Sequence, residues 1–122
     1  MRQVVRLGKG DVDALRAQVR GLEAVLPDGS ILDTLAAIIA CHPLEASQLG
    51  RKYAQAMSGG GGSPIFASRA TASPIDAVFA NAMTAHAAEI NDFIPSAYVQ
   101  PGPAIVPVAL EAARLNGRTG AD

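Results

Sequence analysis

Large apolar residues recur at spacings of three and four along much of the chain, a pattern typical of helices that bury one face. The first predicted helix, over residues 11–26, begins at a cap provided by Asp11 and ends at a Pro-Asp-Gly sequence. A second helix is predicted over residues 30–41, with Ser30 as its N-cap. It ends because His42 precedes a proline, which disfavours helical backbone. The apolar face of the first helix consists of Val12, Leu15, Val19, Leu22 and Leu26.

Two more helices are predicted in the middle of the chain. One spans residues 44–57 and carries Leu49, Tyr53 and Met57 on one face. The other is opened by Ser73, which is followed by a proline at the first helical position and a carboxylate at the third. Its predicted apolar side consists of Val78, Phe79, Ala82, Met83 and His86.

A last helix is predicted to begin at Gly102 and to end at residues 116–117, an Asn-Gly pair. Pro107 is expected to be tolerated only if it falls within the first turn. Residues 119–122 look like the cap of another helix. Residues 64–72 are predicted to form an exposed loop or a short extended piece, and no stretch alternates in the manner of a solvated strand. The pattern therefore predicts an all-α fold of about five helices.

Composition narrows this picture. The 122 residues form at most one ordinary domain, and 49% of them are apolar, with alanine prominent among these. Small apolar residues let helices approach closely without filling much volume. The sequence therefore favours closely packed helices or a piece of a larger domain. Ten basic and eleven acidic residues provide no excess positive charge, so nucleic-acid binding is not expected.

The chain also lacks the features of a membrane or secreted protein. Its longest apolar stretch, residues 31–41, is interrupted by Asp33 and Thr34 and is shorter than the roughly 20 residues that cross a bilayer. Charged and glycine residues stand where a signal peptide would have its apolar core. The single cysteine, Cys41, excludes an internal disulfide. A cytoplasmic location is the expectation.

The glycine run over residues 59–62, together with Ser63, matches a common artificial linker, and that origin is one interpretation of the segment. The other is that the run is native, because the residues on either side continue one pattern. It lacks the lysine of a phosphate-binding loop and follows a helix rather than a strand, so phosphate binding is not expected.

Side chains capable of chemistry are densest at the end of the fourth predicted helix and in the loop that follows it. His86 and Glu89 are three residues apart, so they are neighbours if the helix persists, and a histidine beside a carboxylate suits acid/base chemistry. The alternative is that His86 is a partly buried helix residue hydrogen-bonded to a neighbour, with Glu89 and Asp92 as solvated ends. The whole cluster consists of His86, Glu89, Asn91, Asp92, Tyr98 and Gln100.

Two other kinds of site are disfavoured. A metal site needs more ligands than His86 and Glu89, and nothing in the sequence orders His42 near them, so no metal is expected. Cys41 and His42 are adjacent, but adjacent helix residues point in different directions. Cys41 is therefore expected to be a small buried apolar residue.

Two segments resemble the N-terminal helical domain of the MmgE/PrpD family. Residues 81–93 read NAMTAHAAEINDF, and residues 100–113 read QPGPAIVPVALEAA. Residues 31–37 and 61–82 follow the family's leading helix, glycine loop and next helix in order. The resemblance covers residues 28–122 and leaves residues 1–27 as an N-terminal helical extension. It implies a cofactor-independent lyase or epimerase related to 2-methylcitrate dehydratase, cis-aconitate decarboxylase and iminodisuccinate epimerase.

The resemblance also implies roles for the clustered residues. Glu89 occupies the position of an aspartate that faces the substrate, and Asp92 matches the last aspartate of an acidic run. With His86 they are the expected catalytic residues. The expected substrate-binding residues are Asn91, Tyr98 and Gln100.

Two positions depart from the family's pattern. Phe93 stands where a substrate-binding threonine is usual, and Gln100 stands where a histidine is usual. Phenylalanine donates no hydrogen bond, and glutamine transfers no proton near neutral pH, although its amide still binds a carboxylate or carbonyl oxygen. The resemblance therefore implies altered substrate contacts or a loss of the usual chemistry.

The implied reaction is proton abstraction from a small di- or tricarboxylate with loss of water or carbon dioxide. Relatives are several hundred residues long and draw further catalytic groups from later chain, so this chain is expected to be part of a domain and inactive alone. The alternative function is a non-catalytic helical module from a truncated or split gene. Such a module would form a homo-oligomer such as a dimer, or dock with a partner chain that supplies the rest of the domain.

Overall fold

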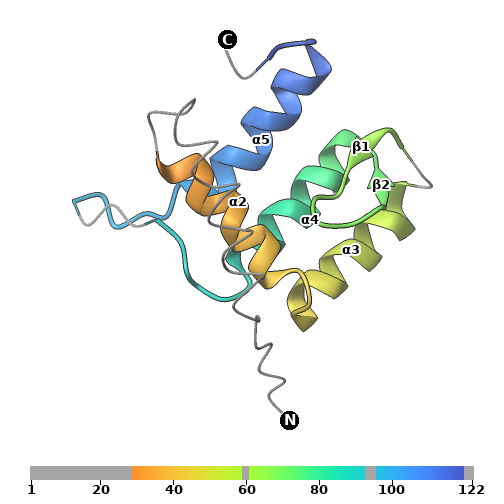
Figure 1. Ribbon diagram of the computed structural model, residues 1–122. Helices are drawn as coiled ribbons and strands as arrows, with labels where there is room; N and C mark the ends of the chain where they lie inside the picture. The colour runs from red at the N-terminus through yellow and green to blue at the C-terminus, as the bar shows by residue number, and fades with distance from the viewer. Residues whose placement is uncertain (1–28, 59–60, 93–95, 120–122) are drawn as a thin grey trace, which may run out of the picture.

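The computed structural model describes residues 29–58, 61–92 and 96–119 (Figure 1). Within these ranges the chain forms four helices and one pair of very short strands. The all-α class is confirmed, and the helix predicted over residues 11–26 lies outside the described residues. The elements are α2 (Gly29–Cys41), α3 (Glu45–Ser58), β1 (Ser63–Pro64), β2 (Thr71–Ala72), α4 (Pro74–His86) and α5 (Gly102–Leu115).

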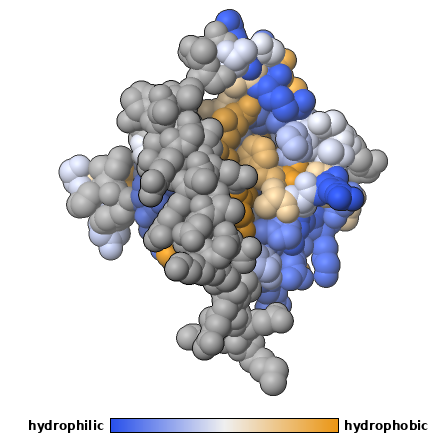
Figure 2. All heavy atoms as spheres, in the orientation of Figure 1, coloured by the Kyte–Doolittle hydropathy of each residue, from blue (hydrophilic) through white to orange (hydrophobic). Residues whose placement is uncertain are grey.

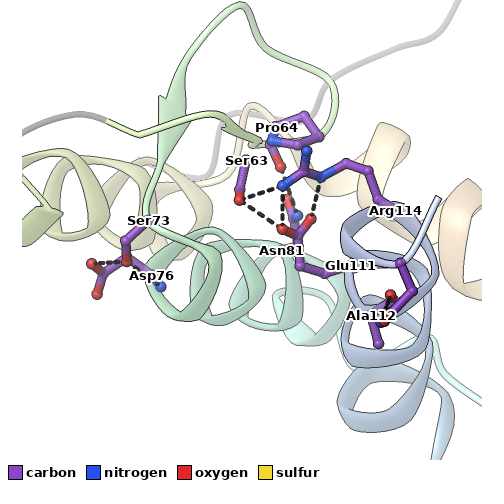
Figure 3. Close-up of polar contacts among 9 residues, drawn as sticks. Ser63, Pro64, Ser73, Asp76, Asn81, Glu111, Ala112 and Arg114 are labelled. Atoms are coloured by element: carbon purple, nitrogen blue, oxygen red, sulfur yellow. Dashed lines mark hydrogen bonds and ion pairs between the residues drawn. The ribbon is translucent and has the colours of Figure 1, made fainter.

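Helix α4 is the centre of this arrangement. It packs against α2, α3 and α5 and also touches both strands, which lie over one side of it (Figure 1). Its predicted start is confirmed: the backbone N–H of Asp76 donates to Ser73 Oγ at 3.3 Å, and that hydroxyl donates to Asp76 Oδ2 at 2.6 Å (Figure 3). Pro74 occupies the first turn, where a missing N–H costs nothing.

The face that α4 buries differs from the predicted one. Its buried residues are small or polar, whereas Phe79 is 42% exposed and His86 is also exposed. Val78, Ala82 and Met83 are only partly buried. Small side chains let the neighbouring helices approach the α4 backbone, and this close packing outweighs the burial of larger residues. The buried residues of α4 are Ala77, Ala80, Asn81, Thr84 and Ala85.

Helix α3 departs from its predicted face for the same reason. It buries Ser47, Gly50 and Ala54 against α4. The predicted apolar residues Leu49, Tyr53 and Met57 are 55%, 50% and 62% exposed. A β-carbon added at Gly50 would lie 3.3 Å from the Met83 side chain, which shows how closely the two helices approach.

The segment predicted as an exposed loop or a short extended piece, residues 64–72, is a partly buried hairpin, so the extended backbone is confirmed at its two ends and the exposure is wrong. Ser63 pairs with Ala72 and Pro64 with Thr71 in antiparallel register. Ile65 and Ala72 are 1% and 0% exposed, because they join the alanines of α3 and α4 in the core. Asn81 holds the hairpin on α4: its Oδ1 accepts from the Phe66 N–H at 2.8 Å, and its Nδ2 donates to the Pro64 carbonyl at 3.2 Å.

Helix α5 ends as predicted, at a cap formed by Asn116 and followed by Gly117 with φ of +62°. The expectation for Pro107 is wrong, because it lies inside the helix, beyond the first turn, and the helix continues. Proline in a helix interior removes one backbone hydrogen bond. The Pro107 ring is fully buried, and this packing offsets the loss. In the described ranges, no helix is both long and apolar enough to cross a bilayer.

The glycine run packs closely where it enters the hairpin. A β-carbon added at Gly61 would overlap the carbonyl of Ala72 and lie 2.6 Å from the backbone nitrogen of Ser73. One added at Gly62 would meet nothing within 4 Å. Gly61 therefore fits its place in the fold, which favours the interpretation that this glycine is native.

We expect the substitution Gly61→Ala to lower the free energy of unfolding by about 1–3 kcal/mol, because the backbone it meets must shift. Gly62→Ala is the matched control and should change it by no more than about 0.5 kcal/mol. Urea unfolding followed by circular dichroism measures both. Equal effects of the two substitutions would contradict the close packing at Gly61.

Candidate functional site

The cluster identified in the sequence lies at the C-terminal end of α4, where the helix gives way to irregular backbone. Helix α4 ends at His86, and the Glu89 N–H donates to the His86 carbonyl at 3.1 Å. Glu89 has φ of +56°, in the left-handed region. The helix does not persist to Glu89, so the condition under which His86 and Glu89 would be neighbours on one helical face is not met.

Three of the predicted residues are joined by hydrogen bonds. The Asn91 side-chain amide donates to His86 Nδ1 at 3.1 Å and to Gln100 Oε1 at 3.4 Å. An amide nitrogen only donates, so this contact is a hydrogen bond in the His86 tautomer that carries its proton on Nε2 and accepts at Nδ1. Asn91 thereby connects the end of α4 to the residues just before α5.

Asn91 also has an unsatisfied acceptor. Its Oδ1 is buried and has no hydrogen-bond partner among the residues that the structure describes. Buried polar atoms are nearly always paired, so an orphan acceptor marks a place for a donor such as water or a ligand hydroxyl. The described residues therefore leave one acceptor of the site without a donor.

Asp92 makes a different contact. Its Oδ1 accepts from the backbone N–H of Gly102, the first residue of α5, at 2.9 Å. Asp92 is half-buried, and its carboxylate lies at the N-terminus of a helix, where negative charge is stabilised. The alternative in which Asp92 is simply solvated is therefore wrong.

The remaining predicted residues are at the surface. Glu89 and His86 are exposed, and Tyr98 is 86% exposed, with φ of +55°. The structure thus brings His86, Asn91 and Gln100 together, and it joins Asp92 to α5. Three exposed side chains leave this group open to water, which weakens electrostatic interactions with any ligand.

Cys41 is the last residue of α2 and His42 lies in the turn that follows, and they do not form a nucleophile with its base. Cys41 is 2% exposed, and burial raises the pKa of its thiol, against a smaller opposite effect of a backbone hydrogen bond from Ala88. Burial, and then repulsion from Arg51, lower the pKa of His42. A neutral buried thiol is unreactive, as the sequence predicted. In the described part of the chain, no three His, Cys, Asp or Glu side chains are grouped to hold a metal ion.

A second polar cluster was missed by the sequence analysis and joins the hairpin to α5 (Figure 3). Ser63 Oγ donates to Glu111 Oε1 at 2.6 Å, and Arg114 donates to both Glu111 oxygens at 2.7 and 2.9 Å and to Ser63 Oγ at 2.9 Å. The hydrogen bonds from Arg114 chiefly lower the pKa of the Glu111 carboxyl. None of the buried side-chain atoms of this cluster lacks a partner, so its role is to hold the hairpin and α5 together. The i, i+3 spacing of Glu111 and Arg114 was visible in the sequence, but the participation of Ser63 was not.

An apolar groove of about 290 Å³ lies between the first half of α4 and the second half of α5, at the opposite ends of these helices from the His86 cluster. None of the predicted site residues lines it. Figure 2 shows apolar residues reaching the surface beside polar ones in this view. The groove is lined by Pro74, Ile75, Val78, Val108, Glu111, Ala112 and Leu115.

Comparison with protein families matches the chain to the MmgE/PrpD N-terminal domain over residues 28–122. The chain belongs to the MmgE/PrpD family. The match includes all six residues of the predicted cluster and supports the resemblance seen in the sequence. No curated protein and no solved structure matches the chain.

Because the backbone of Glu89 is left-handed, we expect replacement of this residue by glycine to stabilise the protein. A non-glycine residue in this region costs about 1–2 kcal/mol, of which the greater freedom of glycine in the unfolded chain offsets part. We expect Glu89→Gly to raise the free energy of unfolding by about 0.5–1 kcal/mol. Ala67→Gly should have a similar effect, because Ala67 has φ of +55° outside the cluster.

Gln55→Gly, in the middle of α3, is the matched control and should lower the free energy of unfolding by about 1 kcal/mol. Chemical unfolding of the three variants measures these changes. A loss of stability in Glu89→Gly equal to that in the control would show that Glu89 is not held in strained backbone.

Proposed function

We propose that this chain forms one wall of the substrate site of an MmgE/PrpD-like lyase that acts on a small di- or tricarboxylate. The observation that carries the proposal is the hydrogen-bonded group of His86, Asn91 and Gln100, with the unpaired Oδ1 of Asn91 beside it. A hydroxyl or a protonated carboxyl of a ligand satisfies that oxygen, and the amide of Gln100 binds a carboxylate oxygen. The family membership supports the assignment of this segment to substrate binding.

For loss of water, the proposed chemistry is abstraction of a proton next to a carboxylate: the C–H electron pair forms the double bond, and the hydroxyl group leaves as water with a proton from the donor. For loss of carbon dioxide, the electron pair of the broken C–C bond stays on the substrate carbon, which takes up a proton from the donor. Glu89 is the proposed base, because it is the carboxylate of the cluster whose side chain is exposed rather than held at α5. His86 is the proposed proton donor, through Nε2, because its Nδ1 contacts the Asn91 amide. Asn91, Gln100 and Tyr98 are the proposed binding residues.

The same exposure leads us to propose that the chain binds substrate but does not turn it over by itself. Lyases of this kind depend on a water-excluded site in which fixed dipoles stabilise the developing charge. Exposed His86 and Glu89 lack such an environment in the described structure. A partner or a further segment would have to cover them.

A second candidate function is a non-catalytic module that self-associates or docks with a partner. The observation that favours it is the apolar groove between α4 and α5, where Ile75, Val108 and Leu115 are 82%, 53% and 56% exposed. Apolar surface of this kind on a small chain is typical of an interface.

Titration of the purified chain with 2-methylcitrate tests the first proposal, with NMR shifts of side-chain amides as the measurement. We expect the Asn91 and Gln100 amide signals to move with a Kd on the order of 1 mM, which corresponds to roughly −4 kcal/mol, and no dehydration product to accumulate. Glu89→Gln should bind with a similar Kd.

Turnover by the wild-type chain, abolished in Glu89→Gln, would contradict the proposal that the chain is inactive alone. Unmoved Asn91 and Gln100 signals would contradict the carboxylate site. If the same sample also sediments faster as its concentration rises, the docking module is the better account.

A further inference from the structure

Helix α5 begins without a cap of its own. Pro101 is its N-cap residue, it provides no side-chain hydrogen bond, and the first turn contains no acidic residue. The first N–H groups of a helix need acceptors from elsewhere. Asp92 lies ten residues earlier in the chain, and its Oδ1 accepts from the N–H of Gly102 at 2.9 Å.

The space around Gly102 is closed by the same carboxylate. Gly102 is buried, and a β-carbon added to it would lie 2.5 Å from Asp92 Oδ1 and 2.5 Å from Thr34 Oγ1. Thr34 is 3% exposed and belongs to α2. Two helices and the loop after α4 therefore meet at one point, and only glycine permits that approach.

This meeting point lies next to the proposed binding group. Asn91 is the residue before Asp92, and Gln100 is two residues before Gly102. The bond from Gly102 to Asp92 closes the intervening chain into a loop whose two ends carry Asn91 and Gln100. The Asn91 Nδ2 atom then lies 3.4 Å from Gln100 Oε1 and donates a hydrogen bond to it.

We propose that Asp92 is a positioning residue rather than a catalytic one: it holds the start of α5 and so fixes Gln100 against Asn91 for ligand binding. The sequence placed Asp92 with the catalytic residues, but its carboxylate is already engaged by a backbone N–H. This role rests on the proposed function, because it assigns ligand binding to Asn91 and Gln100. The hydrogen bond between Asp92 and Gly102 is an observation that stands apart from that function.

The test compares Asp92→Asn with Asp92→Ala. Asparagine keeps an oxygen acceptor of the same reach but loses the charge, whereas alanine removes the acceptor. If Asp92 acts by holding Gly102, Asp92→Asn should keep slow amide exchange at Gly102 and a Kd for 2-methylcitrate within twofold of the wild type. Asp92→Ala should speed exchange at Gly102 at least tenfold, move the Gln100 side-chain amide signal, and weaken binding at least fivefold.

Asp76→Ala is the matched control, because it removes the carboxylate at the start of α4 instead. It should leave the Gly102 exchange rate, the Gln100 signal and the Kd unchanged, which separates positioning from a general loss of stability. Gly102→Ala is an independent route to the same effect, since its β-carbon displaces Asp92 and Thr34.

The proposal is overturned if Asp92→Asn loses binding as fully as Asp92→Ala, because the charge and not the acceptor would then be required. It is also overturned if Asp92→Ala leaves Gly102 and Gln100 unchanged. Absence of binding in the wild-type chain would contradict the proposed function alone. In that case the exchange at Gly102 and the Gln100 signal still decide whether Asp92 positions the loop.

Discussion

The packing of small residues on α4 is the interaction on which the rest of the described structure depends. Ala77 and Ala80 are 1% and 0% exposed, and Ala54 of α3 is 0% exposed against them. Dispersion contacts between closely spaced backbones replace the contacts that large side chains make in most cores. Because α2, α5 and the hairpin also pack on α4, this contact decides where the end of α4, and hence His86, is placed.

Polar contacts then hold the hairpin and the start of α5 in place on this core of small residues. Asn81 binds the hairpin from α4, and the Ser63, Glu111 and Arg114 cluster binds it from α5. Asp92 holds the start of α5 in the same manner. Charged groups take part in two of these three contacts, and hydrogen bonds to charged groups are stronger than neutral ones.

Several of the larger apolar side chains of α3, α4 and α5 are left on the outside, whereas Ile38 and Ile65 are buried. The Tyr53 and Phe79 rings meet with their centroids 5.2 Å apart on the exposed side of α3 and α4, and the groove between α4 and α5 is lined with further apolar residues. Because α3 and α4 bury alanines such as Ala54 and Ala80 and expose Tyr53 and Phe79, they present an apolar surface suited to association. The fold thus accommodates both a wall of a substrate site and a docking surface, at opposite ends of α4 and α5.

Much of the fold was predictable from local sequence, because local contacts determine it. The cap at Ser73, the stop at Asn116 and the helix bounds depend on residues within four positions of one another. The buried faces of α3 and α4 were not predictable. The usual rule places large apolar residues inside, and it fails here because small residues on these faces let the helices pack closely.

The candidate site was also predictable only in part. The density of functional side chains and the family resemblance identified its residues, but they did not identify the hydrogen-bond partners of those residues. The helix ends before Glu89, whose backbone is left-handed, so it forms no helical pair with His86. The bond from Gly102 to Asp92 joins residues ten positions apart, beyond the reach of local sequence patterns.

The most direct measurement of the small-residue core compares the unfolding free energies of Ala80→Leu and Phe79→Ala. The two residues are adjacent on α4, but Ala80 is 0% and Phe79 is 42% exposed. If close helix packing dominates, Ala80→Leu costs about 1–3 kcal/mol through overpacking, and Phe79→Ala costs less than that. A larger loss in Phe79→Ala, near the roughly 3–5 kcal/mol of a buried phenylalanine, would show that the large apolar residues form the true core.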